Sequence, residues 1–278
     1  MKRITEKIKD GIGCHYPAGE VTALIRIIAT ELLGVSQMTF FLKDDVTLTA
    51  GQEALLDNAI TRLKKQEPIQ YILGYSDFCG LRFKVTPATL IPRPETSELV
   101  EWIASEAIGK ESILDIGTGS GCIAVSLAHK MPQSKVTAWD ISPDALAVAA
   151  ENSKANGQAV TFEQVDILVY QPTGEQFDII VSNPPYIKEN EKEAMHANVL
   201  DWEPHTALFV PDSDPLVFYR TIAKKGLALL KPDGKLYFEI NRAHGQETVE
   251  MLKSLGYTGI ELRKDFADND RMIRAIKN

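Results

Sequence analysis

From about residue 95 onward, short apolar runs alternate with longer segments in which apolar residues recur at helical spacing. The short runs, each bounded by polar or turn residues, are typical of buried strands. Helical segments between most of them predict an α/β fold with a doubly wound, mostly parallel seven-stranded sheet. Because only the short segment KDFADND separates the last two strands, the final strand is expected to be antiparallel to its neighbour. The predicted strands are 112–116, 135–140, 160–166, 177–182, 234–240, 257–263 and 271–276.

The first part of the chain, residues 1–66, carries only helical patterns and is predicted to be a small all-helical domain. Residues 67–94 are predicted to be a hairpin linker, because LRFKV alternates apolar and polar positions, and residues 95–278 form the strand–helix domain. The helical domain either merely packs on its neighbour or docks a partner, and the pattern leaves both open. Its two helical stripes are Val21, Leu24, Ile25 and Ile28, and Leu56, Ile60 and Leu63.

Composition and charge narrow the possible classes of protein and of partner. The 278 residues are 44% hydrophobic and 24% charged, an ordinary globular balance. Mean hydropathy is -0.12, no apolar run is long enough to span a bilayer, and the N-terminus lacks a signal peptide, so we expect a cytoplasmic protein. Three widely spaced cysteines suggest neither a disulfide framework nor a metal site. A net charge of -8 disfavours a nucleic-acid partner and is compatible with a basic protein partner.

A glycine loop, LDIGTGSGC, follows the first predicted strand of the domain and opens a helix. Gly117, Gly119 and Gly121, with Thr118 and Ser120 between them, allow a tight turn and a close approach to a ligand. An acid at the end of the next strand, Asp140, is suited to accept hydrogen bonds from ribose hydroxyls. These features predict a site for an adenosine cofactor.

Two residues favour S-adenosylmethionine over NAD. The dinucleotide-binding fingerprint, G-x-G-x-x-G or A, has Gly or Ala at its last position, where this chain has Cys122. Asp115, just before the loop, is poorly placed for a pyrophosphate but suits the ammonium of a methionine moiety.

Asp166 and Ile167, after the third strand, are predicted to contact the adenine of the cofactor. The alternative is that Asp166 is a loop aspartate that only caps a turn.

The run DIIVSNPPYI, residues 178–187, ends a buried strand in an amide, two prolines and an aromatic ring. In a doubly wound sheet this strand lies beside the first, so Asn183 is expected next to the glycine loop. The Asn183 oxygen and the Pro184 carbonyl can accept both hydrogens of a planar NH2 group, while Pro185 stiffens the turn and Tyr186 stacks on the target. Positioning of this kind predicts nitrogen methylation, with Asn183 close to both substrate and cofactor.

This tetrapeptide does not by itself choose between a base in nucleic acid and a glutamine in protein. A third alternative is an adenosine-binding module without catalytic activity, which the intact Asn183 and Tyr186 disfavour. No general base is evident. The proton of the methylated nitrogen is expected to leave after transfer, to water or to the oxygens of Asn183 or Pro184.

Several segments together resemble the bacterial peptide-chain release factor glutamine methyltransferases, the HemK or PrmC family. The resemblance covers essentially the whole chain and is weakest over residues 1–60. Its segments are EPIQYILG (67–74), LRFKVTPATLIPRPET (81–96), LDIGTGSGCIAVSLA (114–128), NPPYI (183–187), EPHTALFV (203–210) and GLALLKPDGKLYFEI (226–240).

The resemblance implies a class I S-adenosylmethionine-dependent methyltransferase domain behind a helical domain that docks the substrate. The implied reaction methylates the side-chain nitrogen, N5, of the glutamine in the Gly-Gly-Gln motif of class I release factors and leaves S-adenosylhomocysteine. It also implies that residues 117–121, Asp140, Asp166 and Ile167 contact the cofactor, and that residues 183–186 hold the glutamine. We expect a monomer that acts on release factors, with no direct nucleic-acid partner and no membrane attachment.

The chain departs from the family pattern at a few positions. Ser97 replaces a usual Glu, with Glu98 beside it, and Asn241 stands where Gly is common. Asp268 and Asn269 replace a common Gly-Arg. Two further residues, Arg93 and Arg271, match family positions, where buried ion pairs and cofactor contacts are both open.

Overall fold

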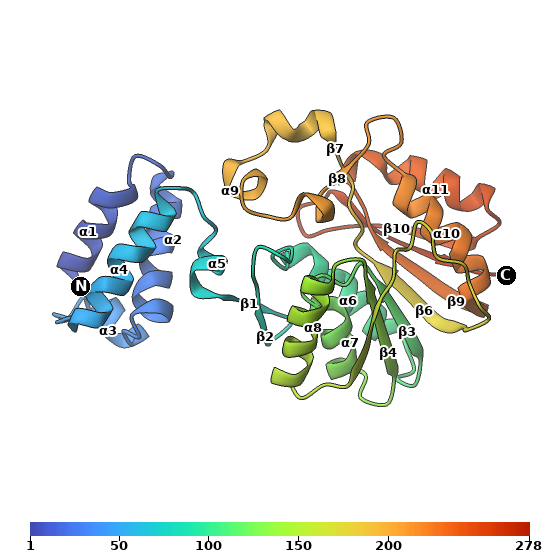
Figure 1. Ribbon diagram of the computed structural model, residues 1–278, viewed down its shortest axis with the longest axis horizontal. Coiled ribbons are helices and arrows are strands. Elements are labelled where there is room, and N and C mark those ends of the chain that lie inside the picture. Colours follow the sequence, from blue (N-terminus) through green and yellow to red (C-terminus); the bar gives the residue numbers. More distant parts are fainter. The chain divides into compact units, whose positions relative to one another are not determined.

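The computed structural model describes residues 1–278, except for the side chain of Ala194. The chain divides into two compact units, and most of their elements are labelled in Figure 1. The helical unit comprises Met1–Gly74 and His196–Trp202, and the sheet unit comprises Tyr75–Met195 and Glu203–Asn278. None of the helices that the structure describes combines the length and apolar character that crossing a membrane requires.

The helical unit has a core of its own, made by the apolar faces of its helices. All residues of the two predicted stripes are buried in this core, so the prediction of amphipathic helices is confirmed. Thr49 caps the longest helix of the unit in a capping box with Gln52. Its helices are α1 (Lys2–Ile12), α2 (Ala18–Ile27), which runs on into a π-helical turn (Ile28–Leu32), α3 (Gln37–Leu42), α4 (Ala50–Leu63), α5 (Ile69–Leu73) and α9 (Ala197–Leu200).

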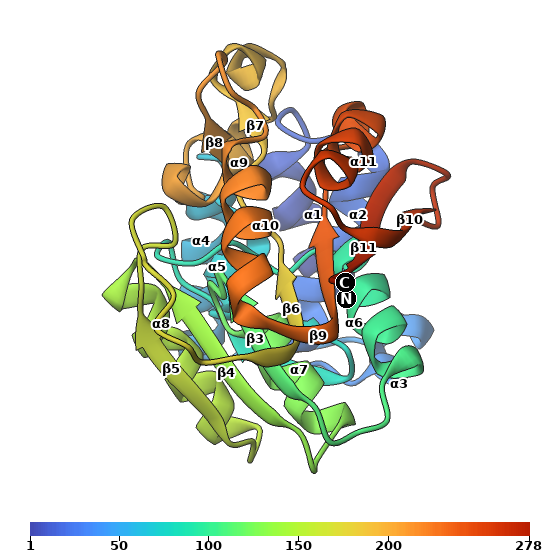
Figure 2. The ribbon, with the colours of Figure 1, turned by 90° about the vertical axis from the view of Figure 1, so that its right-hand side faces the viewer.

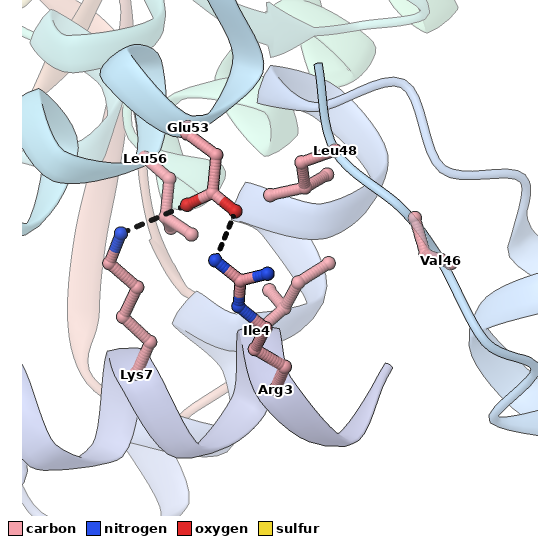
Figure 3. A pocket seen from close by; sticks show the side chains of 7 residues that line it. All are labelled: Arg3, Ile4, Lys7, Val46, Leu48, Glu53 and Leu56. Carbon is pink, nitrogen blue, oxygen red and sulfur yellow. Dashed lines mark hydrogen bonds and ion pairs between the residues drawn. The ribbon is translucent and has the colours of Figure 1, made fainter. Parts of the chain in front are cut away.

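A small pocket between α1 and α4 is closed by ion pairs (Figure 3). Arg3 and Lys7 reach the two oxygens of Glu53 at 2.9 and 3.0 Å. The apolar side chains of Ile4, Val46, Leu48 and Leu56 line the rest of the pocket. Because its charged groups already satisfy one another, this pocket joins two helices and offers no unpaired group to a ligand.

An antiparallel hairpin, β1 (Tyr75–Phe78) and β2 (Leu81–Lys84), opens the sheet unit. It occupies only the middle of the predicted linker, residues 67–94. The first part of that stretch is the helix α5, which ends at Gly74 with φ +81°. Phe78 and Phe83 anchor the hairpin in the core of the sheet unit.

Seven strands form one sheet in the order β10-β11-β9-β6-β3-β4-β5. Only β11 is antiparallel to its neighbours, β9 and β10, and the other pairs are parallel. This confirms the predicted mostly parallel sheet and the antiparallel last strand. The strands are β3 (Ser112–Ile116), β4 (Lys135–Asp140), β5 (Val160–Gln164), β6 (Phe177–Ser182), β9 (Leu230–Glu239), β10 (Thr258–Lys264) and β11 (Asp270–Ile276).

Helices cover both faces of this sheet. The core on one face is built with α6 (Pro94–Glu106) and α7 (Cys122–Lys130), and the core on the other with α10 (Val217–Leu229) and α11 (Gly245–Ser254). The helix α10 contacts β9, the strand that follows it, and the two can be followed in Figure 2. The helix α8 (Pro143–Ala155) begins at the N-cap Ser142 and packs near β4 and β5. Two short parallel strands, β7 (Ile187–Lys188) and β8 (Phe209–Val210), lie outside the large sheet.

Candidate active site

The carboxyl ends of β3 and β6 meet at the centre of the sheet, where the strand order reverses. Ser182 pairs with Ile116, and its hydroxyl donates to the Ile116 carbonyl at 2.6 Å. The next residues on the two strands are Asn183 and Gly117. The prediction that Asn183 lies beside the glycine loop is therefore confirmed, and a ligand at this switch point meets both segments.

The glycine loop is held by backbone hydrogen bonds and has open space above two of its glycines. Gly117, Gly119 and Gly121 have φ values of +76°, +56° and +79°, which side chains rarely adopt. The N–H groups of Gly117 and Thr118 donate to the Trp139 carbonyl at 2.8 and 3.0 Å. A Cβ on Gly117 or Gly119 would meet nothing within 4 Å, so a ligand can approach the backbone there. By contrast, Gly121 lies against α8.

Asp115 is fully buried at the foot of the loop. Its Oδ2 accepts from the Thr118 hydroxyl at 2.6 Å, whereas its Oδ1 has no hydrogen-bond partner among the described residues. Burial raises the pKa of this carboxyl to about 7, against the opposing effects of the Thr118 hydroxyl and of the Ala124 backbone. An unpaired buried oxygen of this kind is suited to bind a cationic ligand group, such as the ammonium of S-adenosylmethionine.

Asp140 ends β4 and faces the same loop. Its Oδ2 accepts from the Gly119 N–H at 2.8 Å and its Oδ1 from the Ser142 N–H at 2.9 Å. Burial raises its pKa, while these backbone bonds oppose the shift. Each carboxylate oxygen can accept a second hydrogen bond, so the group remains suited to a pair of ribose hydroxyls.

Asp166 and Ile167 follow β5, the strand next to β4. The strand ends at Gln164, two residues earlier than the predicted range of 160–166. Asp166 Oδ1 accepts from the Leu168 N–H at 2.8 Å, which is the turn-capping contact of the alternative interpretation. The Ile167 carbonyl accepts from Lys225 Nζ at 2.6 Å. The structure therefore places this pair on the edge next to Asp140, with one carboxylate oxygen used by its own turn.

The Asn-Pro-Pro-Tyr segment is fixed along its backbone. Pro184 is buried and Asn183 is half-buried. The Tyr186 N–H donates to the Leu208 carbonyl at 3.2 Å, and its carbonyl accepts from Asn241 Nδ2 at 3.1 Å. The ring packs against the core while staying partly exposed, and burial raises the pKa of its hydroxyl, which stays protonated. A rigid pair of carbonyl acceptors beside an aromatic ring can hold a planar amide.

Three residues support this site in ways that were not predicted from the sequence. They are Thr96, Glu239 and Asn241. Asn183 Nδ2 donates to Thr96 Oγ1 at 3.5 Å, and the Thr96 hydroxyl donates to Glu239 Oε2 at 2.6 Å. Glu239 is 1% exposed at the end of β9. A carboxylate that closes an otherwise apolar strand, in LYFEI, is the one signal that the sequence carried for this contact.

Both arginines whose roles the sequence left open form ion pairs with buried carboxylates. Arg93 contacts Glu203 at 2.5 Å, and Glu203 also accepts from the Ile91 N–H at 3.1 Å. Arg271 contacts Asp265 at 3.0 Å. These pairs fix the segment before α6 and the turn before β11.

The departures from the family pattern have local explanations. Ser97 donates to the Pro94 carbonyl, inside the first turn of α6. Glu98 accepts from the Phe266 N–H and so holds the turn before β11. Asp268, in that turn, has φ +64°, a conformation that explains why glycine is common at this position and that Asp tolerates.

Comparison with known proteins decides the family. A family model described as PrmC N-terminal domain matches residues 17–74, and one described as Methyltransferase small domain matches residues 95–201. The chain is 50% identical over 276 residues to the release factor glutamine methyltransferase of Bacteroides thetaiotaomicron, covering 99% of each chain. The chain belongs to the release factor glutamine methyltransferase family. The Flavobacterium psychrophilum member is 46% identical and covers 99% of this chain and 98% of its own.

A solved structure supports the fold of this family member. The crystal structure of a methyltransferase from Pyrococcus furiosus aligns with a TM-score of 0.55 at 19% identity, covering 80% of this chain and 99% of that chain. At this identity the similarity concerns the fold, which is the class I methyltransferase fold. Among the described residues, no cluster of three or more His, Cys, Asp or Glu side chains could hold a metal ion.

Proposed function

We propose that this chain transfers a methyl group from S-adenosylmethionine to the side-chain amide nitrogen of the glutamine in the Gly-Gly-Gln motif of class I peptide chain release factors. The observation that carries the proposal is the position of Asn183-Pro184 at the end of β6, directly beside the glycine loop at the end of β3. The family supports this choice of substrate, and a nucleic-acid base is not favoured.

On the cofactor side, Asp115 would pair its unpartnered Oδ1 with the methionine ammonium, and Asp140 would accept from the ribose hydroxyls. The loop from Gly117 to Gly121 would lie against the ligand through its backbone. Asp166 and Ile167 would bound the adenine. When bound, S-adenosylmethionine supplies a methyl group on a positively charged sulfur, which a nucleophile can take up.

On the substrate side, an amide nitrogen is a poor nucleophile because its lone pair is delocalised into the carbonyl. Asn183 Oδ1 and the Pro184 carbonyl would accept its two hydrogens and hold the nitrogen in one direction. Pro185 would keep these acceptors rigid, and Tyr186 would stack on the planar amide. Fixing the reactants in this way can lower the barrier by several kcal/mol, on the order of 7 or more in favourable cases.

The test is to incubate the protein with methyl-labelled S-adenosylmethionine and release factor, and to locate the label by mass spectrometry. We expect label on the Gly-Gly-Gln glutamine. Asn183→Ala should lower kcat by roughly 10²–10³, because one of the two acceptors is lost. The matched control is Asn190→Ala, the same substitution at an exposed position outside the site, which should leave kcat unchanged.

A parallel incubation with DNA distinguishes the alternative. Label on DNA and none on release factor would mean that the site methylates a nitrogen but that the substrate is wrong. Label on neither the release factor nor the DNA would point to an adenosine-binding module without catalytic activity.

Three further features belong to this proposal. The helical unit docks the release factor, the protein acts as a monomer, and it works in the cytoplasm, where release factors function. A molar mass near 30.8 kDa by light scattering would support the monomer, and twice that value would contradict it.

A further inference from the structure

Three side chains from distant parts of the sheet unit form a chain of hydrogen bonds that ends at the proposed substrate site. It runs from Asn183 after β6, through Thr96 on the first turn of α6, to Glu239 at the end of β9. Thr96 and Glu239 are 2% and 1% exposed, so the chain is closed to solvent except at Asn183, which is half-buried. Neither Thr96 nor Glu239 belongs to the residues assigned above to the cofactor or to the substrate.

The direction of this chain follows from the chemistry of its last member. An ionised carboxylate only accepts hydrogen bonds, so the single hydrogen of the Thr96 hydroxyl must point to Glu239. Thr96 Oγ1 is then left as an acceptor toward Asn183, and only the NH2 end of that amide can satisfy it. The Asn183 oxygen must therefore point the other way, which is the orientation that a substrate NH2 group requires.

A protonated Glu239 would allow the opposite direction. Its O–H can donate to Thr96, the Thr96 hydrogen can then donate to Asn183 Oδ1, and the amide turns its NH2 toward the substrate. Two NH2 groups would then face one another without an acceptor, which a partly buried site disfavours.

We propose that Thr96 and Glu239 are positioning residues: ionised Glu239 orients the Thr96 hydroxyl, and Thr96 holds the Asn183 amide with its oxygen toward the substrate nitrogen. The inference rests on the proposed function and extends it to the device that aligns the acceptor. It also gives a reason for a carboxylate in the core, since Glu239 makes no ion pair among the described residues.

The surroundings of Glu239 place its titration in a useful range. Burial raises its pKa to about 7, against the opposing effects of the Thr96 bond and of Arg271 on β11. Arg93 and Glu95, at the start of α6, act on it in opposite directions. Tyr186, Tyr219 on α10 and Cys122 on α7 also interact with Glu239, and all three stay neutral because burial raises their pKa. Both arginines are engaged elsewhere, with Glu203 and Asp265. The aligned state should accordingly be lost as the pH falls through neutrality.

The test measures kcat/KM for the release factor at saturating S-adenosylmethionine, from about pH 5.5 to about pH 8.5. Wild type should lose about tenfold per pH unit on the acid side. Glu239→Gln should have lower activity at high pH and a flat acid side, because the amide does not titrate. Saturating cofactor keeps the titration of Asp115, which would affect the KM for the cofactor, out of this profile.

The matched pair at Thr96 tests the middle of the chain. Thr96→Ser keeps the hydroxyl and should retain kcat within about threefold, whereas Thr96→Val keeps the shape and should lower kcat about 10- to 100-fold. A readout without turnover is the affinity for a Gly-Gly-Gln peptide with S-adenosylhomocysteine bound. It should weaken at low pH in wild type and stay constant in Glu239→Gln. A merely structural role would change the unfolding temperature and leave these pH profiles as they are.

Two outcomes would overturn the inference while leaving the proposed function standing: a Glu239→Gln variant with the wild-type acid side, or a Thr96→Val variant with wild-type kcat. If Glu239→Gln failed to fold, the Thr96 pair and the wild-type pH profile would still decide. A wild-type protein that methylated no release factor at any pH would instead contradict the proposed function, and the inference with it.

Discussion

Asp115 shows how a single residue can be poorly suited to the folded protein and well suited to a ligand. Its carboxyl is fully buried, its Oδ1 has no partner among the described residues, and burial raises its pKa to about 7. An unfolded aspartate titrates near 3.9, so the ionised form is disfavoured in the folded state. The free energy of unfolding should therefore fall as the pH rises from about 4 to about 7, the opposite of a salt-bridged carboxylate.

Replacing Asp115 with Asn should stabilise the protein when no cofactor is bound. We expect a gain in the free energy of unfolding on the order of 2–4 kcal/mol at about pH 8, shrinking toward zero at about pH 4. Urea unfolding at both pH values measures it. The same variant should bind S-adenosylmethionine more weakly, by calorimetry. A variant equally destabilised at both pH values would contradict the assignment of a buried, unpaired charge.

Gly121 illustrates a second residue requirement, because both its backbone and its surroundings exclude a side chain. Its φ is +79°, and a Cβ there would lie 3.1 Å from the Ala149 Cβ. Gly121→Ala should lower the free energy of unfolding by about 2 kcal/mol or more. Gly157→Ala is the matched control, because its φ is +66° with nothing within 4 Å, and it should cost only about 1 kcal/mol. Equal losses in thermal unfolding would show that the α8 contact is unimportant.

At the scale of elements, Glu106 ties together the end of α6 and two neighbouring strands. It accepts from Arg274 of β11 at 2.6 and 2.8 Å, from Tyr237 of β9 at 2.9 Å, and from Trp102 of α6 at 2.6 Å. Lys235 adds a further contact at 3.1 Å. Burial would raise the pKa of Glu106, but these donors outweigh it and lower the pKa to about 2.

Glu106→Gln should therefore destabilise the sheet unit in a pH-dependent way. Because the folded pKa is depressed below the unfolded value of about 4.3, the stabilisation is present above that value and is lost as the pH falls toward 2. We expect a loss of roughly 2–3 kcal/mol at neutral pH, disappearing between about pH 5 and about pH 2. A difference between wild type and variant that did not change with pH would argue against the ionised network. Equilibrium unfolding at several pH values decides.

The elements that could be predicted are those with a local signal. The strands β3, β4 and β6 were predicted with their observed bounds, because compact apolar runs end in glycine, aspartate or asparagine. The short helix α5 was missed, since five residues carry too little periodicity.

The parts of the site that could not be predicted depend on contacts between distant segments. Thr96 and Glu239 are 143 positions apart in sequence, and Ile91 and Glu203 are 112 apart. No local pattern reports such pairs, so the sequence could indicate which residues lie at the ends of β3 and β6 but not the side chains that hold them.

At the scale of the whole molecule, the two units have separate cores. The clusters of the sheet unit draw only on residues of that unit, from Phe78 to Ala275, and the helical core draws only on residues up to Ile72. The helical unit also includes α9, and Trp202, which follows it, donates through Nε1 to the Lys65 carbonyl at 3.1 Å. Separate cores suggest that the functions of the two units can be tested separately.

A fragment of residues 75–278 should fold and bind S-adenosylmethionine within about threefold of the full chain, because the sheet and both of its clusters are complete. It should methylate intact release factor about 100-fold less efficiently, since residues 1–74, the larger part of the proposed docking unit, are missing. A short Gly-Gly-Gln peptide is the matched control substrate, and the fragment should use it as well as the full chain does. Equal loss on both substrates in a labelled-methyl assay would contradict a docking role.

The position of α9 in the chain has a consequence for how such an enzyme evolves. The helical unit takes its last segment, His196–Trp202, from between β7 and β8, after the Asn-Pro-Pro-Tyr residues. No single recombination point therefore separates the two units. A gene fusion that exchanged residues 1–74 alone would leave α9 behind, because His196–Trp202 is encoded elsewhere in the gene. The proposed docking of release factor by the helical unit therefore implies that a change of protein substrate requires matched changes at two separate places in the gene, in residues 1–74 and in residues 196–202.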